Sequence, residues 1–176
     1  EEKKISRNHT ELFLKKINAD IKVKKLKKGN LISVRGQKNL YAFNYTVGSD
    51  PSSAAFLIAL TLLTPGSKLT LPGIICNDTR IGFIKILKKM NGRIRIENLK
   101  RDSTSGELVG TVITHGSRLK PITVSENIAK FVDELPAVFA VAALQNGVSK
   151  FYRCQELIHK ESNRLLEMKK ILMQIG

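Results

Sequence analysis

The feature that most constrains this fold is a segment that occurs twice. Residues Phe13–Val23 align without a gap with residues Ile86–Ile96. Each copy has the pattern of the last turns of an amphipathic helix, then a small residue at a turn, then an alternating strand. A third helix pattern, Arg164–Gly176, has the same spacing as Arg80–Gly92. This repetition indicates a fold built from copies of one unit.

The segments before the last two helices also recur. Pro51–Leu63 is a helix pattern followed by the strand pattern Lys68–Leu71, and Pro136–Leu144 is a helix pattern followed by the strand pattern Val148–Cys154. The predicted unit is therefore strand, helix, strand, helix, strand, strand, which is an α/β fold. The first copy lacks its leading half and the third helix lacks its strand, so we expect this sequence to be part of a longer one.

Composition narrows the class of protein. Of 176 residues, 42% are apolar. The chain has 30 Lys and Arg but only 15 Asp and Glu, which gives a net charge of +15. This charge favours an anionic partner, either nucleic acid or small phosphorylated molecules. The longest apolar stretch, Ala54–Thr64, is shorter than the ~20 residues of a membrane span. Two distant cysteines, Cys76 and Cys154, argue against a disulfide scaffold or zinc site and favour a cytoplasmic location.

Two adjacent carboxylates, Asp133 and Glu134, interrupt the apolar segment Phe131–Phe139. They could be a helix cap, because Asp is a favoured N-cap and the following Pro136 is tolerated in a first helical turn. They could also provide a general base in a partly desolvated cleft, where its pKa can be tuned. The two interpretations are compatible, since a capped carboxylate can still face a ligand.

Lys160 and Arg164 are four residues apart, so on a helix they would share a face near its N-terminal end, where the dipole disfavours cations. Both could simply be solvated. Alternatively an anion lies between them, with Arg164 as a bidentate clamp on a carboxylate or phosphate. The apolar residues that follow at helical spacing are predicted to be core: Leu165, Met168, Leu172 and Ile175.

The segment Ser6–Glu11 begins the first helix pattern. Ser6 or Thr10 could cap this helix, or Ser6 and Arg7 could form an anion site with the free backbone N–H groups. A lysine-rich strip follows, and its alternation with apolar residues favours a strand with one solvated face over a nucleic-acid patch: Lys22, Lys24, Lys25, Lys27 and Lys28. Aromatic residues are 6% of the chain, too few for base-stacking platforms.

Four motifs together resemble the 5-enolpyruvylshikimate-3-phosphate synthases: Ser6–Glu11, Gly48–Phe56, Asp133–Pro136 and Lys160–Leu165. Their order and spacing along nearly the whole chain make this resemblance specific. It implies two domains, each built from three βαβαββ units in an inside-out α/β barrel, of which only part is present here. Residues 1–47 would be the C-terminal end of the first domain. Residues 48–176 would begin the second, with one full unit, a partial second unit and a hinge near 48–51.

The resemblance also implies an activity. The family transfers the enolpyruvyl group of phosphoenolpyruvate to the 5-hydroxyl of shikimate 3-phosphate and releases phosphate, a step of the shikimate pathway to the aromatic amino acids. No metal or organic cofactor is implied, nor a nucleic-acid or membrane partner, and the full-length form is expected to be a monomer.

Residue roles follow from the same resemblance. Asp133 would contact the shikimate ring and accept a proton, and Glu161 would donate one. Ser6 and Lys160 would bind the phosphate of shikimate 3-phosphate. Arg164 would clamp the carboxylate of phosphoenolpyruvate.

The chain departs from the family pattern at several points. Asn163 and Asn8 stand where relatives usually carry Asp, and Gly48–Asp50 reads Gly-Ser-Asp instead of Gly-Asp. Asn163 removes an expected ion-pair partner of the neighbouring Arg164. The early Lys-Ser motif, the Gly-rich phosphoenolpyruvate loop, the Asp-His-Arg segment and the late lysine are absent from these 176 residues. We therefore expect little or no turnover from this chain alone.

Three other functions stay open. A relative of the UDP-N-acetylglucosamine enolpyruvyl transferases would share fold and chemistry, but Ser6–Glu11 and Lys160–Leu165 follow the shikimate pattern. A basic nucleic-acid-binding module would lose affinity steeply with salt, by roughly −0.9 in the logarithmic slope per phosphate contacted on B-DNA. An inactive structural remnant would bind none of these ligands.

Overall fold

A computed structural model describes residues 2, 7–36, 39–125 and 131–176 of the chain. Helices and strands alternate along it, which confirms the α/β class. The described elements are α1 (His9–Lys16), β1 (Asp20–Lys25), β2 (Asn30–Arg35), α2 (Pro51–Leu63), β3 (Lys68–Ile75), α3 (Gly82–Lys89), β4 (Arg93–Arg101), β5 (Leu108–His115), β6 (Thr123–Val124), the 3₁₀ helix η2 (Val132–Glu134), α4 (Leu135–Ala143), β7 (Lys150–Phe151), the 3₁₀ helix η3 (Gln155–His159) and α5 (Arg164–Gln174).

The repeated segment forms the same structure in both copies. Helices α1 and α3 end, and strands β1 and β4 begin, at matching positions of the alignment. Between helix and strand, Asn18 (φ 64°) and Asn91 (φ 73°) occupy the same left-handed position. Asparagine is one of the few residues besides glycine that adopts this conformation readily. In both copies the strand then pairs with an antiparallel partner, β2 or β5, so the predicted repeat is confirmed.

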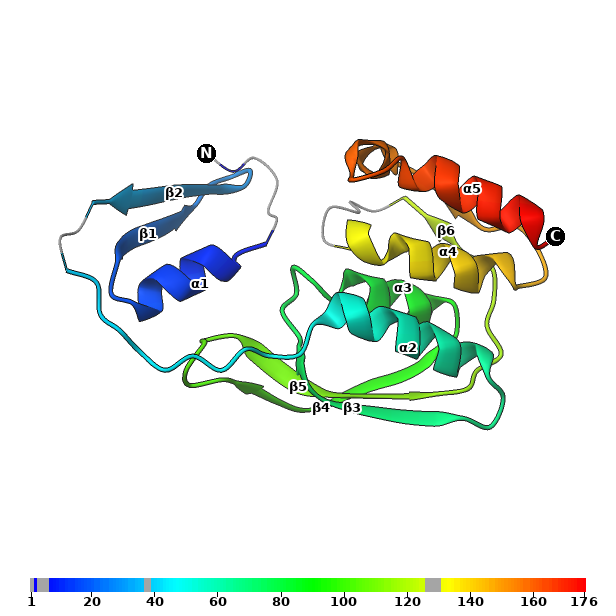
Figure 1. Cartoon of the computed structure of the whole chain (residues 1–176), viewed down its shortest axis with the longest axis horizontal. Coiled ribbons are helices and arrows are strands. Elements are labelled where there is room, and N and C mark those ends of the chain that lie inside the picture. Colours follow the sequence, from blue (N-terminus) through cyan, green and yellow to red (C-terminus); the bar gives the residue numbers. More distant parts are fainter. Residues whose placement is uncertain (1, 3–6, 37–38, 126–130) are drawn as a thin grey trace.

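The centre of the molecule is a three-stranded antiparallel sheet of order β3-β5-β4. Helix α2 packs on β3 and β5, helix α3 packs on β4, and α4 packs on both helices on the side away from the sheet (Figure 1). Strand β6 pairs in parallel with β7, and α4 connects the two. Before α2, Ser49 makes a single parallel bridge to Ile74. The leading strand of the first full unit is thus reduced to one residue.

Two predicted strands differ in length. β3 continues beyond Leu71 to Ile75, because Gly73 adopts φ 69° and the register with β5 shifts there. The strand predicted over Val148–Cys154 is only β7, Lys150–Phe151.

The core lies between the sheet and the helices that cover it. Its fully buried side chains come mainly from α2, α3 and α4 and include Ile58, Leu62, Phe83, Ile86, Leu87, Leu135 and Val138. Of the four apolar residues predicted as core on α5, none is buried, and only Leu165 packs against the core. Met168 and Leu172 are half-buried at the surface of the helix. Ile175 is 70% exposed, because it lies at the C-cap, beyond the last turn of α5.

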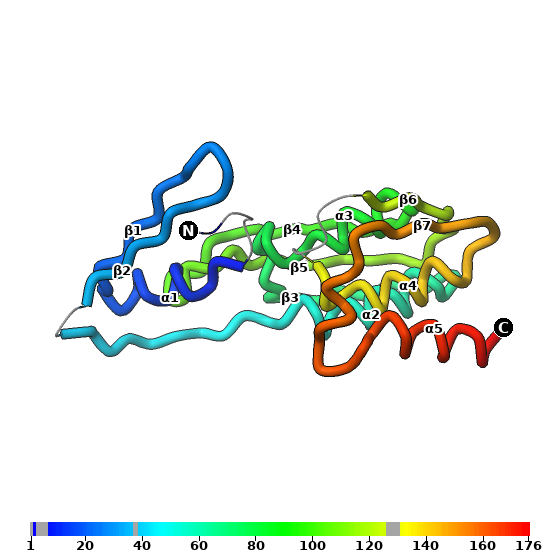
Figure 2. Tube along the Cα trace, turned by 90° about the horizontal axis from the view of Figure 1, so that it is seen from above, coloured from blue at the N-terminus to red at the C-terminus, as the bar shows by residue number. Residues whose placement is uncertain are grey.

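Helix α1 and the β1–β2 hairpin form a small unit at one end, and residues 39–48 run in an extended path from this end toward α2 (Figures 1 and 2). The lysine-rich strip belongs to this hairpin and its turn, and all five lysines are exposed, as predicted. The unit contacts the β4–β5 loop, where Lys16 Nζ donates to the Ser103 carbonyl. The segment before α2 contacts the same loop, because Thr46 N donates to Thr104 Oγ1 at 3.0 Å. In the described part of the chain, no helix has the length and apolar character of a membrane span.

Candidate active site

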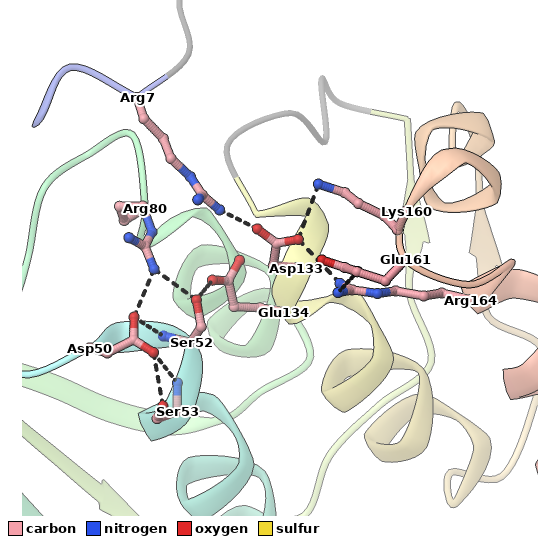
Figure 3. Close-up of polar contacts among 10 residues, drawn as sticks. All are labelled: Arg7, Asp50, Ser52, Ser53, Arg80, Asp133, Glu134, Lys160, Glu161 and Arg164. Atoms are coloured by element: carbon pink, nitrogen blue, oxygen red, sulfur yellow. Dashed lines mark hydrogen bonds and ion pairs between the residues drawn. The ribbon is translucent and has the colours of Figure 1, made fainter. Parts of the chain in front are cut away.

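Asp133 lies at the centre of a cationic cluster. It belongs to η2, just before α4. Its Oδ1 is 3.2 Å from Lys160 Nζ and 3.1 Å from Arg164 Nη1, and its Oδ2 pairs with Arg7 Nη2 (Figure 3). The residue at the N-cap of α4 is Glu134, which makes no side-chain cap hydrogen bond. The interpretation of the two carboxylates as a helix cap is therefore wrong.

Lys160 and Arg164 were predicted to lie on one helix, but they do not. Lys160 follows η3, whereas Arg164 is the first residue of α5. The connection between them still turns both side chains toward Asp133 (Figure 3). Asn163 is the N-cap of α5 and accepts a hydrogen bond from Leu166 N at 3.1 Å. Asparagine at this position therefore starts the helix that carries Arg164.

Arg164 is oriented by two carboxylates. Besides Asp133, its Nη2 donates to Glu161 Oε2 at 2.6 Å. The Glu161 side chain is 80% exposed, so it stands at the solvent side of the cluster. These contacts replace the ion pair that Asn163 cannot make.

The third cation comes from the other end of the sequence. Arg7 precedes α1 and reaches Asp133 across 126 residues of chain. Sequence reasoning had paired Arg7 with Ser6 as a weak anion site, but did not connect it with Asp133. Ser6 itself lies outside the described residues. Asp133, Lys160, Glu161 and Arg164, the other predicted site residues, are brought together.

The electrostatics of the cluster favour an ionised Asp133. Burial alone would raise the pKa of this carboxyl, but hydrogen bonds from Lys160 and Arg7 and their charges lower it below its ordinary value. The pKa of Glu161 is also lowered, by hydrogen bonds from its own backbone amide and from Arg164. In this state both acids are carboxylates, and Asp133 is surrounded by more positive charge than it neutralises.

A second polar network lies behind Asp133, and sequence reasoning missed its key residue, Arg80. Arg80 Nη2 donates to Asp50 Oδ1 and to Ser52 Oγ, both at 2.8 Å, and the Ser52 hydroxyl donates to Glu134 Oε1. Asp50 also caps α2, accepting from Ser52 N at 3.2 Å and Ser53 N at 2.9 Å. The repeat contained the signal, because Arg80 and Arg164 occupy equivalent positions in the alignment of Arg80–Gly92 with Arg164–Gly176, close to the start of α3 and at the start of α5.

Glu134 should make stability depend on pH. It is 1% exposed, and burial raises its pKa despite the Ser52 hydrogen bond. A raised carboxyl pKa means that the folded state binds the proton more tightly, so stability falls as pH rises through that pKa. Glu134→Gln removes this titration. We expect its free energy of unfolding, relative to wild type, to increase between pH 4 and pH 8 in urea titrations; an unchanged difference would contradict a buried, titrating Glu134.

A cavity of ≈ 410 Å³ opens beside the cluster. Ser52, Asp133 and Arg164 contribute polar groups to its wall, and Phe56, Pro136 and Met168 contribute apolar ones. In the described residues, no three His, Cys, Asp or Glu side chains lie close enough to hold a metal ion. The arrangement suits a small anion: cations to bind phosphate or carboxylate groups, and a carboxylate between them to exchange a proton.

Comparisons with known proteins agree on one family. The family described as EPSP synthase (3-phosphoshikimate 1-carboxyvinyltransferase) matches residues 1–176. A 3-phosphoshikimate 1-carboxyvinyltransferase of Helicobacter pylori (strain G27) is 35% identical over 99% of this chain and 39% of its own length. That of Caldicellulosiruptor saccharolyticus is 39% identical over 98% of this chain and 39% of its own.

A solved EPSP synthase from Acinetobacter baumannii superposes with a TM-score of 0.83 and 34% identity, over 95% of this chain and 37% of that one. The chain thus spans about two fifths of the length of the relatives that it matches.

Proposed function

This chain belongs to the EPSP synthase family, and we propose that it forms part of an active site that transfers the enolpyruvyl group of phosphoenolpyruvate to the 5-hydroxyl of shikimate 3-phosphate. The observation that carries this proposal is the convergence of Arg7, Lys160 and Arg164 on Asp133. Two phosphorylated substrates side by side need such a surplus of cations.

Each side chain has a proposed role in binding. Lys160, with Ser6, holds the phosphate of shikimate 3-phosphate. Arg164 clamps the carboxylate of phosphoenolpyruvate with its planar guanidinium, which suits bidentate contact. Asp133 accepts a hydrogen bond from the shikimate ring. Its position between Lys160 and Arg164 supports a place for the reacting hydroxyl between the two bound anions.

The proposed reaction has two steps. First, the 5-hydroxyl oxygen bonds to the enol carbon of phosphoenolpyruvate, its proton passes to Asp133, and Glu161 gives a proton to the methylene carbon. Then the bond from the former enol carbon to the phosphate oxygen breaks, the methyl carbon returns a proton to Glu161 to restore the double bond, and inorganic phosphate leaves with the proton held by Asp133. One C–O bond forms and one C–O bond breaks, and both acids end in the protonation state in which they began.

Substrate binding would tune both acids for these roles. The cations that lower the pKa of Asp133 are the same groups that a phosphate dianion would engage. When these cations also contact the substrate phosphate, they stabilise the Asp133 carboxylate less. The pKa of Asp133 then rises, which makes the carboxylate a better base. Likewise, Arg164 bound to a substrate carboxylate releases Glu161, whose pKa then rises toward that of a proton donor.

We further propose the domain assignment of residues 1–47 to the end of a first domain and 48–176 to the start of a second, with the hinge near 48–51. The extended path of residues 39–48, which are in no helix or strand, supports it. The cytoplasmic location and the monomeric full-length form stay predictions.

Ligand protection of the 176-residue chain tests the proposed substrate. Shikimate 3-phosphate at about 100 times its Kd should add about 2.7 kcal/mol of stability, a rise in Tm of about 5–10 °C for a domain of this size. Lys160→Ala should reduce this shift, whereas Lys24→Ala, on the exposed hairpin, should not. Protection by UDP-N-acetylglucosamine instead would favour the sister family, and protection by neither would contradict the proposal.

A further inference from the structure

A second buried carboxylate lies where the α1 unit meets the central sheet. Glu107 precedes β5, and its side chain is 2% exposed. Its Oε1 contacts His9 Nδ1, and its Oε2 accepts from Asn77 Nδ2 at 3.2 Å. Both oxygens of this acid are therefore used, one by the first residue of α1 and the other by the segment after β3.

The residue before His9 takes part in the same network. Asn8 is the N-cap of α1 but makes no side-chain cap hydrogen bond, although asparagine is among the preferred N-cap residues. Its Oδ1 instead accepts from Asn77 Nδ2 at 2.7 Å. Two successive residues at the start of α1 are thus held by groups on the sheet side, at the expense of local helix capping.

The residue before Asn8 is Arg7, which contacts Asp133. The Arg7 side chain is 42% exposed, so neighbouring side chains enclose it only in part. Its placement therefore depends on where the backbone of residues 7–9 is anchored. The anchor is the buried network around Glu107, described above.

We propose that Glu107 is a positioning residue, which holds the start of α1 through His9 and thereby places Arg7 on Asp133. The inference rests on the proposed function only in taking Arg7 and Asp133 as members of the substrate site. Glu107 contacts neither residue, so it acts on the site through the backbone of the segment that it anchors.

The direction in which the Asp133 pKa changes when Glu107 is removed distinguishes a positioning role from a direct effect of the Glu107 charge. Removing a carboxylate anywhere near Asp133 should, by electrostatics alone, lower the pKa of Asp133 or leave it unchanged. Displacing Arg7 should raise it, because one of the two cations that lower the pKa of Asp133 by hydrogen bonding and charge is lost. A rise in the Asp133 pKa on loss of Glu107 is thus a positional effect.

The experiment is a pH titration of the Asp133 carboxyl carbon by ¹³C NMR in the 176-residue chain. We expect Arg7→Ala and Glu107→Leu each to raise the Asp133 pKa. The double variant should show the rise of Arg7→Ala and no more, because both changes remove the same contact. His9→Ala removes the Glu107 contact from the other side and should act like Glu107→Leu, which keeps the test decisive if the latter fails to fold.

Val112→Ala is the matched control. Val112 is a fully buried residue of β5, the strand that follows Glu107, and its truncation should lower stability without moving the Asp133 pKa. The proposal is overturned if folded Glu107→Leu and His9→Ala leave that pKa unchanged, or if the double variant exceeds Arg7→Ala. No substrate enters this measurement, so its outcome is independent of whether shikimate 3-phosphate protects the chain.

Discussion

Replacing Asp133 by asparagine is expected to lower the rate of the proposed enolpyruvyl transfer by about 10²–10⁴-fold, the usual contribution of a well-placed acid–base group. Asparagine keeps the size of the side chain and its carbonyl oxygen, but it can neither carry the charge nor accept the hydroxyl proton. The measurement is the rate of phosphate release from shikimate 3-phosphate and phosphoenolpyruvate. It uses a protein in which this chain is joined to the remaining segments of a full-length relative.

The effect should fall on turnover more than on folding. Asp20→Asn is the matched control, because Asp20 is a half-exposed acid of the β1–β2 hairpin and lies outside the site. It should retain full activity. A small loss for Asp133→Asn, comparable to that of Asp20→Asn, would rule out Asp133 as the proton acceptor and leave it a purely structural counter-ion for the three cations.

Replacing Phe83 by alanine is expected to destabilise the fold by about 3–5 kcal/mol, the usual cost of emptying the place of a buried aromatic ring. Phe83 is the second residue of α3 and is 0% exposed. Its neighbour Gly82 lies so close to Phe131 that a Cβ there would be 2.3 Å from that ring. The surroundings of Phe83 are therefore tightly packed and cannot collapse readily into the cavity.

Urea unfolding followed by circular dichroism measures this loss. Phe56→Ala makes the same chemical change on α2, where the ring is 58% exposed, and should cost about 1 kcal/mol or less. Equal losses for the two variants would mean that the core is not centred between α3 and the sheet.

Much of the local structure was predictable because it depends on neighbours in sequence. The repeat of Phe13–Val23 in Ile86–Ile96 located two helices, two turns and two strands, and the structure adds that the same asparagine conformation closes both helices. Helix α2 was predicted with its correct bounds, since Asp50 and Pro51 are strong start signals and Pro65–Gly66 is a strong stop. Strand lengths were less predictable, because pairing partners decide them.

Only some residues of the candidate site could be predicted from the sequence. The motifs around Asp133 and Lys160–Arg164 were recognisable by residue type. The prediction that Lys160 and Arg164 share a helix was wrong, because η3 ends at His159, before Lys160, and α5 begins only at Arg164. Arg80 was visible only as a position in the repeat. Nothing local could reveal that Glu134 would be buried against Ser52, because that contact joins residues 82 apart.

The repeated unit, the α/β class and the residue types that bind anions follow from the amino-acid sequence, since hydrophobic period, turn residues and charge act over a few neighbours. That Arg7, 126 residues from Asp133, completes the cationic cluster follows from the packing of the folded chain. The contact between Arg7 and Asp133 depends on how the α1 unit packs against the sheet, through Glu107 and its partners. Packing between segments far apart in sequence produces no periodic pattern in either segment, so it could not be predicted from the sequence.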